Sequence, residues 1–132
     1  MIAKLNLSLL PDKFAICRLD ASSKIPDWAC AGSFISITRT LDELSIVCPM
    51  DRVPSVRECN RGWRCFKVEG KLDFSLTGIL AALATPLAEA DVSIFALSTY
   101  DTDYLMVKDV DKEKAIQVLS QAGHQIHTMP EF

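Results

Sequence analysis

The chain has 132 residues, of which 49% are hydrophobic and 23% are charged, so it can bury a sizeable core. Its formal net charge is −3 and its lysines and arginines are scattered, which argues against a nucleic-acid partner because phosphate binding needs a concentrated basic face. No apolar run approaches the roughly 20 residues that span a bilayer, so no membrane partner is expected.

The cysteine pattern favours buried thiols over disulfides or a metal site. The number of cysteines is odd, and no two have the C-x-x-C spacing. We therefore expect free thiols in a reducing, cytoplasmic compartment. We expect His124 and His127 at the surface, without a metal, because residues three apart on a strand face opposite sides. The cysteines are Cys17, Cys30, Cys48, Cys59 and Cys65.

Eight apolar runs rich in β-branched and aromatic residues predict eight strands. They are Ile2–Leu9, Lys13–Leu19, Ser33–Thr40, Leu44–Cys48, Trp63–Glu69, Val92–Thr99, Tyr104–Lys108 and Gln125–Thr128.

Two segments have helical spacing of their apolar residues. The first, "SLTGILAALATPLAEA", begins at Ser75, a favourable N-cap, and Pro86 should kink or tighten its last turn. The second, "DKEKAIQVLSQAG", begins after Asp111 and should stop at Gly123. Two proline-marked segments, residues 25–30 and 53–59, are helical turns or loops.

The order of elements from Trp63 to Thr128 is strand, helix, strand, strand, helix, strand, which is the ferredoxin-like unit. The first half looks like a degenerate copy. "SFISITRTLDELSIVC" (residues 33–48) aligns without a gap on "SIFALSTYDTDYLMVK" (residues 93–108) at an offset of 60, since 93 − 33 = 60. We expect an α+β fold of two tandem modules, at residues 1–62 and 63–132, with the N-terminal strand completing the first.

Sequence templates for catalysis are mostly missing. The chain has no G-x-S-x-G, P-loop, G-x-G-x-x-G or H-E-x-x-H motif. Asp101 and Asp103 could form an acid–base pair only if they were desolvated, and nothing near them in sequence supplies an apolar pocket. We therefore expect no catalytic residue, no cofactor and no enzyme activity.

Two polar segments are better suited to binding. The hairpin tip at residues 98–103 carries hydroxyls and carboxylates, and "EGKLDFSLTGIL" (residues 69–80) joins a strand to a helix start, where free amides attract a carboxylate. Asp73 offers an anionic group for a ligand ammonium, and Gly78 suggests a close approach. The alternatives are a solvated hairpin tip and an ordinary strand-to-helix connection.

The segment "KVEGKLDFSLTGILAALATPLAEADVSIFALSTYDTDYLMVK" resembles the signature region of small bacterial tandem ACT-domain proteins. These proteins are related to the regulatory domains of aspartate kinases. The "S-I-F-x-L-S-T-Y-x-T-D-Y" pattern is similar to that of animal cytosolic arginine sensors, and the first half fits the family in "WACAGSFISITRTLDELSIVCP".

The resemblance implies two ACT modules and a small-molecule site, for an amino acid, at a module interface. The positions that match the family's ligand site come from three segments. They are Leu72, Asp73, Thr77, Gly78 and Ile79 in the loop and helix start, Ser98, Thr99, Tyr100 and Asp103 in the second hairpin, and Ser36, Ile37 and Thr38 in the first. The first half lacks the loop motif, so one pseudo-equivalent site should have decayed.

The sequence therefore favours a non-catalytic, amino-acid-binding regulatory protein that forms a homodimer. The alternative is a structural or interaction module without a ligand, which acts through β-edge pairing. Neither the ligand nor a downstream partner can be named from the sequence, since many functions share the ferredoxin-like fold.

Overall fold

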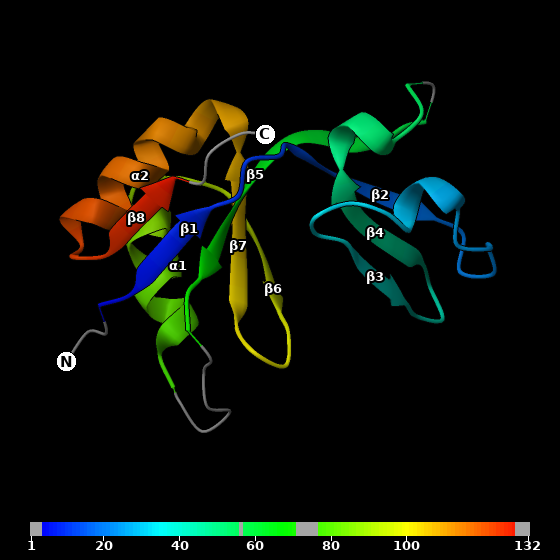
Figure 1. Cartoon of the computed structure of the whole chain (residues 1–132). Helices are drawn as coiled ribbons and strands as arrows, with labels where there is room; N and C mark the ends of the chain where they lie inside the picture. Colours follow the sequence, from blue (N-terminus) through cyan, green and yellow to red (C-terminus); the bar gives the residue numbers. More distant parts are fainter. Residues whose placement is uncertain (1–3, 56, 71–76, 129–132) are drawn as a thin grey trace. The chain divides into compact units, whose positions relative to one another are not determined.

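A computed structural model of the chain describes residues 4–55, 57–70 and 77–128. The chain divides into two compact units (Figure 1). The N-terminal unit is Asp12–Trp63, and the C-terminal unit combines Met1–Pro11 with Arg64–Phe132.

The N-terminal unit is an antiparallel sheet in the order β5–β2–β4–β3. Its strands are β2 (Phe14–Leu19), β3 (Ser36–Arg39), β4 (Leu44–Pro49) and the first residues of β5 (Asn60–Val68). In the order of elements along the chain, the 3-10 turns η1 (Asp27–Ala29) and η2 (Met50–Arg52) take the places that two α-helices have in the C-terminal unit. A small buried cluster that includes Leu44 and Ile46 of β4 forms its core.

The C-terminal unit is a mixed α+β unit whose strand order is β8–β1–β5–β7–β6. Leu83 and Leu87 of α1 share one buried cluster with Leu119 of α2 and Phe66 of β5, so the helices pack on the sheet. Its further elements are β1 (Asn6–Leu9), α1 (Ile79–Glu89), β6 (Ile94–Ser98), β7 (Asp103–Lys108), η3 (Asp109–Asp111), α2 (Lys112–Gln121) and β8 (Gln125–Thr128).

Without β1, both units have the same strand order. If the four strands of each unit are numbered along the chain, they lie in the order 4-1-3-2, which is β5–β2–β4–β3 in the N-terminal unit and β8–β5–β7–β6 in the C-terminal unit. This confirms the α+β class and the two ferredoxin-like modules. The place of the N-terminal strand is a correction, because β1 lies between β5 and β8 of the C-terminal unit and does not complete the first module. The first module takes its fourth strand from the start of β5. Nine residues of β5, about 30 Å at 3.3 Å each, are long enough to serve both units.

The first long helix begins later than the sequence suggests. The expected cap at Ser75 lies outside the described residues, and α1 begins at Ile79, after Gly78 with φ of 78°. A left-handed residue cannot continue a helix, and glycine adopts this conformation at little cost. No described residue has an atom within 4 Å of the position of a Cβ atom on Gly78, so the left-handed conformation is what the described part of the chain offers to explain this glycine.

The two hairpins contain the same four-residue turn. The amide of Thr40 donates to the carbonyl of Glu43, and the amide of Thr99 donates to the carbonyl of Thr102. In both turns the threonine Oγ1 accepts a hydrogen bond from a backbone amide of the turn. The turns are offset by 59 residues, since 99 − 40 = 59. The strands beside them have the same offset, because Arg39 pairs with Leu44 as Ser98 pairs with Asp103. The expected gapless offset of 60 is therefore one residue too large for this hairpin.

Two of the five cysteines are not free, which corrects the expectation of five thiols. Cys17 of β2 and Cys59, just before β5, form a disulfide, with their Cα atoms 4.6 Å apart. Cys48 and Cys65 are buried thiols, and Cys30 is an exposed one. Spacing along the chain could not reveal this pair, because 42 residues separate its members and only the β2–β5 pairing brings them together.

We expect iodoacetamide to label Cys30 of the native protein far faster than Cys48 and Cys65. The thiolate is the nucleophile, and burial raises the pKa of Cys65 to about 12. Burial also raises the pKa of Cys48, and the nearby Arg61 opposes this in part. Mass spectrometry at pH 8 should find a single label at short times and three in denaturant without reductant. Equal early labelling of all three thiols would contradict this assignment.

Candidate functional site

The tip of the β6–β7 hairpin is held against the end of β5. Thr102 is buried, with 4% of its surface exposed, and its hydroxyl donates to the carbonyl of Val68 at 2.6 Å. Val68 is the last residue of β5, where the loop toward α1 begins. Thr102 was not among the expected site residues. In the sequence it is one of several polar residues of a turn, and nothing there indicates that its side chain is buried. The bond holds the polar turn at residues 98–103 against Val68, which directly precedes the other expected segment, residues 69–80, in the sequence.

Hydrogen bonds within the turn fix the side chains at the hairpin tip. The hydroxyl of Ser98 donates to the Asp103 carboxylate at 2.7 Å, and the Thr99 hydroxyl donates to the carbonyl of Thr102 at 3.1 Å. Tyr100 presents 81% of its surface to solvent. The four expected positions therefore lie together on one turn, with an oriented carboxylate and an accessible ring.

The start of α1 supplies backbone amides in the same unit. Thr77 and Gly78 are exposed and Ile79 is half-buried. The amide of Ala82 donates to the carbonyl of Gly78, so the helical ladder begins there and the amides before it have no acceptor within the helix. No side chain among the described residues caps this end. A helix start of this kind favours an anionic group.

The remaining expected positions are not brought to this site. Leu72 and Asp73 lie outside the described residues. Ser36, Ile37 and Thr38 belong to β3 of the N-terminal unit, where β3 pairs only with β4 among the described strands. Their part in a binding site stays a prediction.

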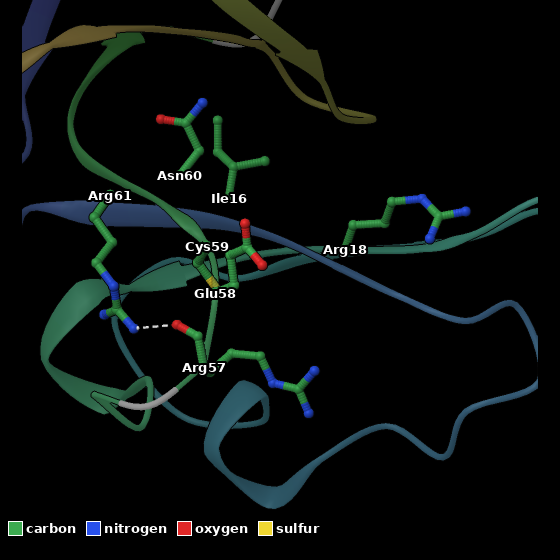
Figure 2. Close-up of a pocket in the computed structure, with 7 residues that line it drawn as sticks. All are labelled: Ile16, Arg18, Arg57, Glu58, Cys59, Asn60 and Arg61. Carbon is green, nitrogen blue, oxygen red and sulfur yellow. Dashed lines mark hydrogen bonds between the residues drawn. The ribbon is translucent and has the colours of Figure 1, made fainter.

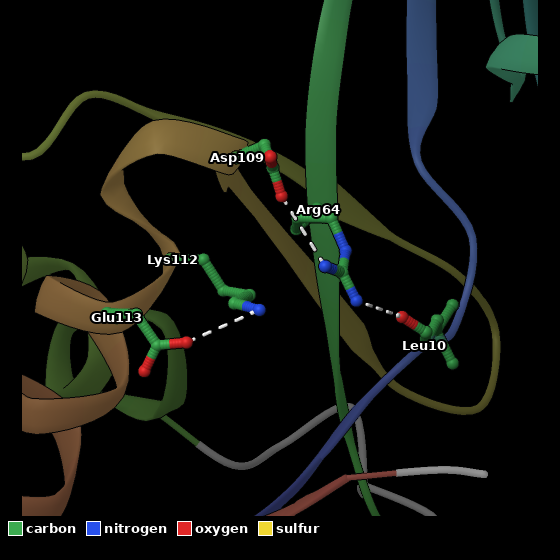
Figure 3. A network of polar contacts seen from close by, with 5 residues as sticks. All are labelled: Leu10, Arg64, Asp109, Lys112 and Glu113. Carbon is green, nitrogen blue, oxygen red and sulfur yellow. Dashed lines mark hydrogen bonds and ion pairs between the residues drawn. The ribbon is translucent and has the colours of Figure 1, made fainter. Parts of the chain in front are cut away.

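A buried arginine in the middle of β5 links three segments of the C-terminal unit (Figure 3). Arg64 exposes 9% of its surface and donates to the carbonyl of Leu10 at 3.3 Å and to the carboxylate of Asp109 at 3.4 Å. Its Nε atom has no partner among the described residues. Arg64 was not among the expected site residues. Its place within the apolar run "WRCFKV" could have indicated a buried arginine.

His124 is buried, which corrects the expectation that it lies at the surface. Only 3% of its surface is exposed. Its Nδ1 accepts from the amide of Leu5 at 3.1 Å, and its Nε2 lies 3.0 Å from the carbonyl of Ala82, where a protonated Nε2 donates. His124 therefore joins β8, β1 and α1. His127 is exposed, and no group of three His, Cys, Asp or Glu suited to a metal occurs among the described residues.

Sequence analysis also missed an arginine-rich pocket in the N-terminal unit (Figure 2). It has a volume of about 720 Å³ and is open to solvent. Its lining residues come from β2, from the segment before β5 and from the start of β5: Ile16, Arg18, Arg57, Glu58, Cys59, Asn60 and Arg61.

No helix in the described part of the chain is both long and apolar enough to cross a membrane.

Comparisons with known proteins agree with this architecture. The profile of the ACT domain matches residues 58–121, and a second profile, of an N-terminal domain, matches residues 12–56. The human cytosolic arginine sensor for mTORC1 subunit 1 is 37% identical over 60 residues, which are 45% of this chain and 18% of that protein. This chain therefore spans less than a fifth of the curated relatives it matches.

Solved structures extend the likeness to the whole chain. A crystal structure of an Agrobacterium tumefaciens protein has a TM-score of 0.92 and 43% identity, covering 98% of this chain and 96% of that one. The Clostridium acetobutylicum aspartate kinase shares the fold, with a TM-score of 0.62 and 15% identity over 85% of this chain and 33% of that one. Because the ACT-domain profile matches residues 58–121, the chain contains an ACT domain and belongs to the ACT-domain family.

Proposed function

We propose that this protein is a non-catalytic regulatory protein that binds an amino acid where the β6–β7 hairpin meets the end of β5. The observation that carries the proposal is the buried hydrogen bond from Thr102 to Val68, which fixes the polar turn against the last residue of β5. Support also comes from the ACT profile and from the similarity to a protein named as an arginine sensor.

The chemistry of the site suits a zwitterion. The Asp103 carboxylate, oriented by Ser98, would pair with the ligand's ammonium group. The amides at the start of α1 would take its carboxylate, and Tyr100 would cover its side chain. Binding would then favour one arrangement of paired modules over another, because a ligand shifts an equilibrium only through its different affinity for the two states.

We also propose that the protein is a homodimer and that it is located in the cytoplasm. The dimer is proposed because ACT modules of related proteins pair their sheets side by side, and the location because the curated relative is named as a cytosolic sensor. The Cys17–Cys59 disulfide would then be a reversible bond, since disulfides of mesophilic cytosolic proteins are usually transient.

Calorimetric titration with each of the twenty amino acids, at millimolar concentration, tests the proposal. We expect heat of binding for at least one of them. For that amino acid, Asp103→Ala should weaken binding at least tenfold, a loss of about 1.4 kcal/mol, because the ammonium loses its carboxylate partner.

The matched control is Glu43→Ala, which removes one of the two acidic residues, Asp42 and Glu43, from the turn of the other hairpin, in the N-terminal unit. It should leave affinity and dimerisation unchanged. If no amino acid gives heat and sedimentation still shows a dimer, the ligand-free interaction module is the better description. Equal losses for both variants would instead show that the acid at the β6–β7 turn has no special part in binding.

A further inference from the structure

The pocket in the N-terminal unit has the charge of an anion site. Three arginines line it, Arg18, Arg57 and Arg61, against one acidic side chain, Glu58. Its volume of about 720 Å³ is within the range of small-molecule sites, about 300 to 1,000 Å³. A second hollow of about 310 Å³ shares Arg57 and Glu58 and adds Trp28 and Pro54. The two hollows therefore adjoin each other at Arg57 and Glu58.

Two of the arginines are held by backbone carbonyls. Arg61 donates from Nη2 to the carbonyl of Pro54 at 2.9 Å and to the carbonyl of Arg57 at 2.8 Å, and Figure 2 shows the second of these bonds. Arg18 donates from Nη2 to the carbonyl of Asp42 at 2.9 Å. A guanidinium group has five N–H donors, so both keep donors for a further acceptor while their positions are fixed.

Arg57 differs from the other two. Its side chain is exposed, and no hydrogen bond or ion pair of its guanidinium group to another described residue is present. Its backbone, by contrast, is fixed at both ends of the residue: its amide donates to the carbonyl of Pro54 at 3.0 Å, and its own carbonyl accepts from Arg61. Arg57 is therefore a cation without a carboxylate partner among the described residues, on a backbone whose amide and carbonyl are both hydrogen-bonded.

The disulfide adds to this order. Cys59 is itself a lining residue, and its bond to Cys17 ties the segment that carries Arg57 and Glu58 to β2. The entropy of ordering these residues is therefore lost on folding and not on binding, which is how preorganised sites gain affinity.

We propose that this pocket binds a small oxyanion, the phosphate or carboxylate group of a metabolite, with Arg57 as its main partner. Arginine presents paired N–H groups that match both kinds of oxyanion. Glu58 stands beside the bound anion and weakens its binding, which favours ligands that also carry a cationic group. This site is separate from the amino-acid site proposed above and uses residues of the N-terminal unit alone.

Titration with inorganic phosphate and, separately, with citrate tests the proposal, at constant ionic strength with chloride as the reference anion. We expect saturable binding of at least one anion at millimolar concentration or below. A stronger response in the phosphate arm identifies a phosphoryl ligand, and a stronger response in the citrate arm identifies a carboxylate ligand.

Three variants locate the site. Arg57→Gln should weaken binding about tenfold or more, and Glu58→Gln should strengthen it about threefold, because each removes one charge from the pocket. Arg52→Gln removes an exposed arginine of η2, outside the pocket, and should change nothing. All three side chains are exposed, so circular dichroism should show intact folds. The proposal is overturned if neither anion binds, or if Arg52→Gln and Arg57→Gln weaken binding equally, which would indicate non-specific charge attraction.

Discussion

Reduction of the Cys17–Cys59 disulfide is expected to lower the free energy of unfolding of the N-terminal unit by about 4 kcal/mol. A disulfide restricts the unfolded chain, and a loop of this length, with its ends 42 residues apart, corresponds to about 4 kcal/mol in the chain-entropy account. The N-terminal unit depends on this bond because its core is small and both helices of the ferredoxin-like pattern are replaced by 3-10 turns.

Urea denaturation followed by tryptophan fluorescence measures this loss, since Trp28 lies in this unit. Dithiothreitol should shift the midpoint of the wild-type protein. The double variant Cys17→Ala and Cys59→Ala should start from the lower midpoint and not respond to the reductant. Cys30→Ala, which removes an exposed free thiol, serves as the control and should behave as the wild type does. A wild-type midpoint that dithiothreitol does not move would contradict the expectation.

Replacing His124 by leucine should destabilise the C-terminal unit by about 3 kcal/mol. The change leaves the amide of Leu5 and the carbonyl of Ala82 without their partner, and an unsatisfied buried group costs about 1 to 3 kcal/mol. Leucine has a similar volume and is apolar, so the loss of hydrogen bonds, and not a cavity, dominates the effect.

His127→Leu is the matched control for this histidine. It changes an exposed residue of the same strand and should alter stability by less than about 0.5 kcal/mol. Thermal and urea unfolding of both variants measure the difference. If the two variants have equal stability, the buried contacts of His124 do not stabilise the unit.

Local sequence signals located much of the candidate site. The polar residues between two apolar strands predict a hairpin, and Ser98, Thr99 and Asp103 do lie on its turn. The start of α1 was not located, because Ser75 was the expected cap, whereas the helix begins at Ile79, directly after the left-handed Gly78. What the pattern could not show is the bond from Thr102 to Val68, since its two ends are 34 residues apart and nothing in the sequence pairs them.

The pocket in the N-terminal unit was missed for a related reason. Arg18 and Arg57 are far apart in the sequence, and each has the appearance of an ordinary surface charge. Only the pairing of β2 with β5 and the disulfide between Cys17 and Cys59 bring them to one pocket. The sequence shows how many arginines the chain has, but not which of them are close to one another in the fold.

By itself, the sequence determined the class of the fold, the recurrence of a strand–strand hairpin and the two helices, because periodicity and turn chemistry are local properties of the chain. The tertiary structure alone decided which strands are neighbours: that β1 joins the C-terminal unit, that β5 serves both units and that two of the cysteines are bonded. The physical reason is that an apolar pattern shows which face of a strand is buried, whereas its partner is chosen by the packing of the whole sheet.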